Sequence, residues 1–129
     1  MTEVPAKCRY TREHEWARAE EGRVVVGITD YAQDQLGDVV FVTLPEPGSD
    51  VEANKPLGEV ESTKSVSDIY SPVTGVVLEK NVEVEESPEL INSDPYGRGW
   101  LVTIEARDGG LDDLLSADEY RRVIEEAGD

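Results

Sequence analysis

The stretch Leu57-Gly58-Glu59-Val60-Glu61-Ser62-Thr63-Lys64-Ser65-Val66-Ser67-Asp68-Ile69-Tyr70 contains one lysine between two segments with the composition of short β-strands. Apolar residues recur at alternate positions, with Val60 in the first segment and Val66 in the second, as half-buried strands require. Small polar residues surround the lysine, namely Ser62, Thr63, Ser65 and Ser67. The pattern predicts a hairpin over about residues 57–72, closed by Ser71-Pro72-Val73-Thr74-Gly75, with Lys64 at its tip.

Lys64 is the candidate functional residue of this hairpin. An exposed lysine offers a primary amine that an enzyme can acylate, which replaces the charge with a neutral amide. A lone lysine is more often a solvated surface charge, so the neighbouring residues Glu61 and Gly75 matter for the interpretation.

The rest of the chain predicts strands with short helical insertions. Four β-branched runs bounded by Gly, Pro or Asn lie at Arg23–Ile28, 39–44, Gly75–Lys80 and 100–105, the last with Trp100, Val102 and Ile104 on one face. A short helix is expected over 29–36, opened by an Asp30 cap with Gln33 three residues on and stopped by Gly37. These elements do not alternate as strand and helix, which argues against a doubly wound nucleotide-binding fold.

A second helix is predicted at the C-terminal end, over about residues 117–127. Ser116-Ala117-Asp118-Glu119 has the pattern of a capping box, and Tyr120, Val123, Ile124 and Ala127 form an apolar stripe that should lie against a sheet. The expected fold is mainly β, with two antiparallel sheets over one core, a short internal helix and this C-terminal helix.

Composition limits the class of protein. A chain of 129 residues suits a single domain, and its net charge of −17 repels phosphate backbones and anionic lipids, so nucleic acid and membranes are poor partners. The charge favours docking to basic protein surfaces, or it reflects an acidic proteome. With no long apolar run and no basic leader, the chain is expected in the cytoplasm, or in mitochondria only if a transit peptide was removed.

The side chains of this sequence do not suggest an enzyme. Cys8 is the only cysteine and is interpreted as an incidental thiol, and His14 is the only histidine. A metal site or a histidine-based triad therefore lacks parts. His14 is expected to have a structural role or to make a docking contact.

Several sequence blocks, in order, resemble the lipoyl and biotinyl carrier domains and, more closely, the H-proteins of the glycine cleavage system. The blocks are Tyr10, His14-Glu15-Trp16, Val26-Gly27-Ile28-Thr29-Asp30-Tyr31-Ala32-Gln33, Leu36-Gly37-Asp38-Val39-Val40-Phe41-Val42, Leu44-Pro45-Glu46-Pro47-Gly48, Val60-Glu61-Ser62 with Lys64, Ser67-Asp68-Ile69-Tyr70-Ser71-Pro72-Val73-Thr74-Gly75, Pro88-Glu89-Leu90-Ile91-Asn92-Ser93-Asp94-Pro95-Tyr96-Gly97 and Gly99-Trp100. Asn54 departs from the usual glycine, but asparagine tolerates the left-handed backbone.

The resemblance implies a barrel-sandwich hybrid over residues 1–129, with lipoate joined to Lys64 as an amide. It also implies a lipoyl ligase or octanoyltransferase as the modifying enzyme. The partners would be a pyridoxal-phosphate glycine decarboxylase, an aminomethyltransferase and a dihydrolipoyl dehydrogenase, between which the arm carries the aminomethyl group of glycine. The hard chemistry would belong to the cofactors.

The resemblance also assigns roles to single residues. Glu61 and Gly75 would help the lipoylating enzyme to recognise the hairpin, and Glu15 and Asp68 would hold the amine of the loaded arm in a cleft. Both carboxylates could instead be ordinary surface charges, and the role of Glu13 is left open.

Two further features have more than one interpretation. The aromatic residues Trp16, Phe41 and Trp100 are expected in the core or in a cleft wall. The turn-rich segment 92–99 could carry partner contacts or only shape the corner before the next strand.

Three other functions compete with this one. A biotinyl domain or a 2-oxo acid dehydrogenase lipoyl domain would lack the His14-Glu15-Trp16 block and the C-terminal helix. A relay protein that donates lipoyl groups to other carriers would need the same lysine, so the sequence does not distinguish it. An enzyme would need a catalytic constellation that the sequence does not show.

Overall fold

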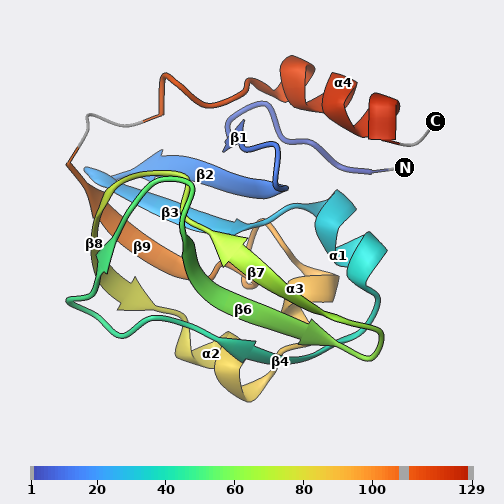
Figure 1. Ribbon diagram of the computed structural model, residues 1–129, viewed down its shortest axis with the longest axis horizontal. Helices are drawn as coiled ribbons and strands as arrows, with labels where there is room; N and C mark the ends of the chain where they lie inside the picture. The colour runs from blue at the N-terminus through green and yellow to red at the C-terminus, as the bar shows by residue number, and fades with distance from the viewer. Residues whose placement is uncertain (1, 108–110, 128–129) are drawn as a thin grey trace.

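The computed structural model describes residues 2–107 and 111–127 and has two antiparallel sheets with short helices (Figure 1). The larger sheet has the strand order β1-β2-β3-β9-β8-β5 and the smaller has β4-β6-β7. The strands are β1 (Arg9–Tyr10), β2 (Glu15–Glu20), β3 (Arg23–Ile28), β4 (Val39–Thr43), β5 (Asp50–Val51), β6 (Pro56–Ser62), β7 (Val66–Tyr70), β8 (Gly75–Lys80) and β9 (Val102–Ala106). The predicted fold class, mainly β with two antiparallel sheets, is confirmed.

The main core lies between the two sheets because each strand turns alternate apolar residues inward. Val42, Val60 and Ile69 enter it from the smaller sheet. Val26 and Ile104 are among those that enter from the larger sheet. In the hairpin, Val60 is buried as predicted, but Val66 is 59% exposed, since its Cα partner Glu61 lies on the outer face of β6.

A second apolar cluster lies on the other face of β1, β2 and β3, under the C-terminal helix α4 (Ala117–Ala127). Tyr10 and Tyr120 stack there with ring centroids 4.7 Å apart, a contact worth about 1 kcal/mol beyond its buried area. The capping box is present, since the Ser116 amide donates to Glu119 and the Glu119 amide to the Ser116 hydroxyl. Ala127, however, is exposed, because the last turn of α4 extends beyond the strands that it covers.

The N-cap of the internal helix α1 (Asp30–Leu36) lies one residue before the Asp30 cap that the sequence predicted. Thr29, which has extended backbone and a fully buried side chain, accepts the Ala32 amide at 3.1 Å and is the N-cap. The Asp30 carboxylate instead accepts the Gln33 side chain at 2.8 Å. Gly37 ends the helix with a φ of 81°, the left-handed backbone that glycine adopts without strain.

Two short helices, α2 (Val82–Glu86) and α3 (Leu90–Ser93), connect β8 to β9. Trp100 packs in the second cluster, while Val102 and Ile104 enter the main core. The prediction that these three side chains lie on one face is therefore wrong. Phe41 is 56% exposed on β4, which makes its placement in a core or cleft wall wrong. In the described residues no helix is both long and apolar enough to cross a membrane.

Candidate functional site

The tip of the β6–β7 hairpin is closed by one buried serine. The Ser62 hydroxyl oxygen accepts the backbone N–H groups of Lys64 and Ser65, each at 3.1 Å, while the Ser62 amide donates to the Ser65 carbonyl at 2.8 Å. Thr63 and Lys64 therefore form the apex of a hydrogen-bonded turn, and the Lys64 side chain is exposed. Because these contacts fix the backbone of the turn, the Lys64 side chain projects from a defined position, although the side chain itself is exposed.

The hairpin tip is also held from the α1–β4 connection. The Thr63 amide donates to the Asp38 carbonyl at 3.1 Å. The Lys64 side chain passes over Gly37, where an added Cβ would lie 3.2 Å from Lys64 Cε. The connection thus supports the lysine from below, at a position where a side chain would crowd it.

Asn92 braces this connection from α3. Its side-chain oxygen accepts the Val39 amide at 2.9 Å, and its NH₂ group donates to the Gly37 carbonyl and to Gln33 Oε1, each at 2.9 Å. Asn92 was noted in the sequence only as part of a turn-rich segment, and nothing in the local sequence connects it with residues 33–39. The segment 92–99 therefore contributes to the site through its first residue.

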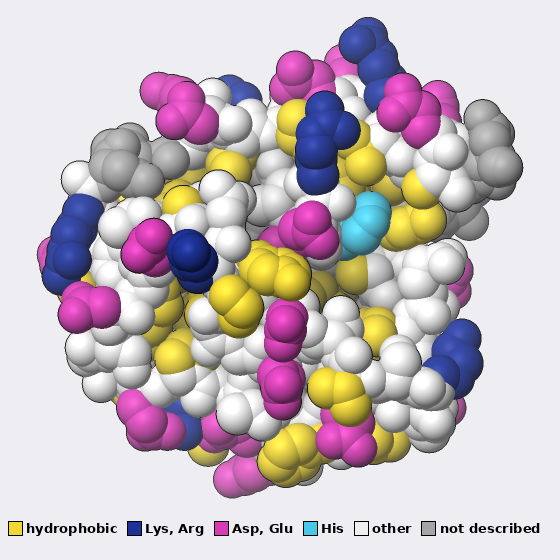
Figure 2. All heavy atoms as spheres, in the orientation of Figure 1, with side chains coloured by type: hydrophobic (Ala, Val, Ile, Leu, Met, Phe, Trp, Pro, Cys, Tyr) yellow, Lys and Arg dark blue, Asp and Glu magenta, His cyan; other side chains and the backbone are white. Residues whose placement is uncertain are grey.

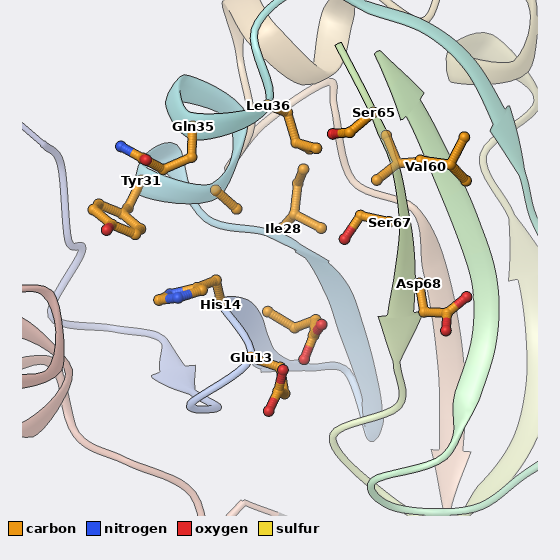
Figure 3. Close-up of a pocket in the computed structure, with 13 residues that line it drawn as sticks. Glu13, His14, Ile28, Tyr31, Gln35, Leu36, Val60, Ser65, Ser67 and Asp68 are labelled. Atoms are coloured by element: carbon orange, nitrogen blue, oxygen red, sulfur yellow. The ribbon is translucent and has the colours of Figure 1, made fainter. Parts of the chain in front are cut away.

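A cleft of about 380 Å³ opens beside the hairpin, between α1 and β7 (Figure 3). Its wall is partly apolar, from Ile28, Leu36 and Val60, and Figure 3 shows the first two pointing into the space that Ser67 faces across it. Its polar end is formed by residues 13–15. A cleft of this size, with a mixed lining and immediately adjacent to Lys64, suits a small apolar arm with a polar end.

Glu15 supplies a buried acid to that cleft. Its side chain is 2% exposed, and its carboxylate accepts the Thr11 hydroxyl at 2.6 Å and the Tyr70 amide at 3.2 Å. Burial raises the pKa of Glu15 to about 7, although both hydrogen bonds act to lower it. Glu15 is therefore not the ordinary surface carboxylate that was the alternative interpretation.

His14 closes the cleft next to Glu15 through a structural network. Its Nδ1 lies 2.8 Å from the Tyr120 hydroxyl, which is also 2.7 Å from the Thr29 hydroxyl, and its ring packs against Tyr31. Burial lowers the pKa of His14, which keeps the ring neutral near pH 7. The histidine consequently adds no positive charge that would compete with a cation for Glu15.

Asp68 and Glu13 both line the cleft, but only at its margin. Asp68 lines the rim of the cleft, but its exposed carboxylate lies on the opposite side of β7 from the Ser67 side chain (Figure 3). Successive strand residues point to opposite faces, and the Cα partner of Asp68 is Glu59 on the outer face. Glu13, whose role was open, lies at the edge of the cleft.

The two residues expected to guide lipoylation are far from equivalent. Glu61 is exposed on β6 beside the tip. Gly75 is buried in β8 of the other sheet, where an added Cβ would lie 2.0 Å from the Glu105 carbonyl oxygen. Gly75 therefore permits a close approach of β8 and β9 in the larger sheet, away from the tip of the hairpin that it was expected to help the lipoylating enzyme to recognise.

Gly58 is a second glycine of this kind, and the sequence reasoning missed it. An added Cβ there would lie 2.3 Å from the Thr43 carbonyl oxygen, at the register shift of β6. A glycine inside an alternating strand pattern is the signal that could have identified it.

Comparisons with known proteins agree with this architecture. The family model described as glycine cleavage H-protein matches residues 8–127. The chain belongs to the glycine cleavage H-protein family. The H-protein resemblance stated from the sequence is thereby confirmed, and family membership implies a lipoyl carrier role.

Individual relatives support this membership over nearly the whole chain. Glycine cleavage system H proteins of Mycolicibacterium vanbaalenii and Rubrobacter xylanophilus are 58% and 56% identical, over 96% and 98% of this chain and 98% of each relative. The crystal structure of a glycine cleavage system H protein from Mycobacterium marinum superposes with a TM-score of 0.86 at 40% identity. It covers 97% of this chain and 99% of that one. The structural match thus covers nearly the whole chain.

Proposed function

We propose that this member of the H-protein family carries a lipoyl arm on Lys64 and shuttles the aminomethyl group of glycine. Its partners would be the pyridoxal-phosphate glycine decarboxylase, the aminomethyltransferase and the dihydrolipoyl dehydrogenase. The observation that supports the proposal best is the pairing of a fixed, exposed Lys64 with an adjacent cleft that ends in the buried Glu15. The chain's role is to present, hold and release the arm.

The residues of the cleft fit the group that Lys64 would carry. The apolar side chains of Ile28, Leu36 and Val60 can contact a hydrocarbon chain and a sulfur-containing ring, while Glu15 lies at the polar end. Lipoate, when attached, supplies a disulfide that can be reduced and can accept the one-carbon group.

Glu15 would hold the amine of the cargo. A cation beside a buried carboxylate favours the ionised acid, and the charged acid in turn keeps the amine protonated. A protonated amine has no free electron pair with which to expel the sulfur from the carbon that they share, so the bond that holds the cargo is retained. Glu13, at the edge of the cleft, would add to the negative potential there, and Asp68 would contribute only from the far side of β7.

Exclusion of water is the second task of the cleft. Desolvation strengthens the interaction between Glu15 and a cation, because the local dielectric falls when the arm fills the space. The same filling keeps water from the carbon that carries the amine.

The experiment begins with modification. The purified chain, incubated with a lipoyl ligase and lipoate, is expected to gain one lipoyl group by intact mass, and Lys64→Arg is expected to gain none while keeping its circular dichroism. A lipoyl group on another lysine in Lys64→Arg would contradict the assignment.

Retention of the cargo is measured next. The lipoylated protein is loaded with glycine and the decarboxylase, the enzyme is removed, and ammonia release is followed without tetrahydrofolate. Glu15→Gln is expected to release ammonia about tenfold faster, which corresponds to about 1.4 kcal/mol. Glu59→Gln makes the same chemical change on the outer face and should behave as wild type. Equal release from Glu15→Gln and wild type would refute the role of Glu15.

A further inference from the structure

Three exposed side chains form a row across the smaller sheet beside Lys64. Phe41 on β4, Glu61 on β6 and Val66 on β7 are direct Cα partners, so their side chains lie on the same face. Phe41 is 56% and Val66 59% exposed, and both are large apolar side chains. The row thus consists of one carboxylate between two apolar side chains, and it lies next to the hairpin tip.

The next row along the same face adds charge. Asp68 and Glu59 are direct partners across β7 and β6, and both are exposed. Like charges placed directly opposite each other weaken a strand pair, so this arrangement does not serve stability. Among the residues that the structure describes, Glu59, Glu61 and Asp68 take part in none of the ion pairs.

Figure 2 shows acidic and hydrophobic side chains next to one another over β6 and β7, on the face turned to the viewer. Apolar side chains left in water next to carboxylates without cationic partners are complementary to a surface with a cationic side chain between apolar recesses. The arrangement therefore fits a basic protein partner.

The reach of the arm decides which partner this is. Enzymes that act on the far end of a lipoyl arm can work at a distance from the lysine that anchors it. The enzyme that forms the amide at Lys64 Nζ must bring its own active site into contact with the hairpin tip. The row lies on the two strands that carry this tip, so an enzyme seated on it is positioned for that reaction.

We propose that the row of Phe41, Glu61 and Val66 is the docking surface for the enzyme that acylates Lys64. The enzyme places an arginine or lysine side chain on Glu61 and apolar side chains on Phe41 and Val66. This inference rests on the proposed function, since it requires Lys64 to be modified. It assigns two apolar residues to a recognition task that the resemblance implies for Glu61 and Gly75.

The test is a kinetic comparison of apo-protein variants as substrates of a lipoate ligase with free lipoate and ATP, followed by intact mass. Phe41→Thr/Val66→Thr removes both apolar surfaces while placing a residue with high strand propensity at each position. We expect its KM as a protein substrate to rise about tenfold or more, with kcat little changed, because hot-spot side chains act on binding. Glu61→Lys is expected to raise KM similarly.

Matched controls separate local docking from general effects. Leu78→Thr removes an exposed apolar side chain from β8, and Glu105→Lys makes the same charge change on β9 of the other sheet. Both should keep the wild-type KM. A third control is reoxidation of the reduced, lipoylated variants by dihydrolipoyl dehydrogenase, whose rate should stay at the wild-type value.

Each outcome decides between the hypotheses. An unchanged KM in Phe41→Thr/Val66→Thr and in Glu61→Lys, with normal modification of the wild type, overturns the docking surface alone. An equal rise in KM for the control variants, or an equal loss of reoxidation in the row variants, overturns it as well. A wild type that gains no lipoyl group overturns both this inference and the proposed function.

Discussion

The Glu15 carboxylate accepts a hydrogen bond from the Tyr70 amide at 3.2 Å, which joins the first residue of β2 to the last residue of β7. The acid at the polar end of the cleft is therefore tied to the strand that carries the hairpin. A movement of the hairpin relative to the larger sheet would change the environment of Glu15. The position of the hairpin and the ionisation of Glu15 are therefore linked by this hydrogen bond.

Glu15 should make stability fall as pH rises. Its pKa is about 7 in the folded chain, because of burial, and 4.5 without the fold, so the folded state binds more protons between these values and unfolding becomes easier as pH increases through them. From pH 5 to pH 8 this contributes a loss of about 2.5 kcal/mol, which Glu15→Gln should remove. Urea unfolding of both proteins at the two pH values measures the difference.

The control for this titration is Glu59→Gln, which removes an exposed carboxylate from β6. It should show the same change with pH as wild type. A Glu15→Gln variant whose stability falls as much as that of wild type would show that Glu15 is already ionised at pH 5.

Ser62→Ala should make the backbone at Lys64 more mobile without changing the Lys64 amine. The variant loses the acceptor for the Lys64 and Ser65 amides, at a cost of about 1 kcal/mol in the free energy of unfolding. It should also be lipoylated more slowly, because the backbone at the tip is no longer fixed. Ser65→Ala, at an exposed neighbouring position, is the control in both chemical denaturation and lipoylation kinetics. Equal rates for the two variants would argue against a positioning role for Ser62.

Asn92 should be essential to the support beneath the tip. Asn92→Ala loses three hydrogen bonds, and we expect destabilisation on the order of 2–3 kcal/mol. Asn92→Asp keeps an acceptor for the Val39 amide but loses the donors to Gly37 and Gln33. Hydrogen exchange at Val39 distinguishes the variants, since protection should be lost in Asn92→Ala and largely kept in Asn92→Asp. Similar exchange in both would mean that the side chain does not bind that amide.

Gly75→Ala should impair lipoylation only through the fold. Its Cβ would meet the Glu105 carbonyl oxygen, so one strand must move, and we expect a loss on the order of 3 kcal/mol or more. Val76→Ala, at the next position of β8, should cost less. The lipoylation rate of Gly75→Ala, divided by its folded fraction, should equal that of wild type, and a clear deficit after this correction would restore a role in recognition.

The sequence predicted the elements whose signals are local. The Lys64 hairpin, the capping box at Ser116 and the left-handed Asn54, which has a φ of 69°, all depend on residues close together in the chain. The cap of α1 was misplaced by one residue because threonine and aspartate both cap helices, and only the backbone conformation at Thr29 decides between them.

The errors in the site share a different cause. Phe41 was expected in a core or cleft wall and is exposed, and the Asp68 carboxylate lies at the rim of the cleft, because the face of the sheet to which each side chain points depends on strand register. The hydrogen bond between Glu15 and Tyr70 joins β2 to β7, and the hydrogen bond between Asn92 and Val39 joins α3 to β4. Each connects residues that are more than fifty positions apart in the sequence. No pattern within one segment carries that information.

The two faces of β7 determine which forms of the carrier the acylating enzyme can tell apart. Ser67 faces the cleft and Asp68 the outer surface, so an arm folded into the cleft, whose lining includes Val66, would leave Phe41 and Glu61 uncovered. Unmodified and lipoylated carriers would then display these docking residues alike. The acylating enzyme could not reject a finished carrier through them, so modified carrier would compete with unmodified carrier, and the rate of modification would depend on the ratio of the two forms as much as on their total amount.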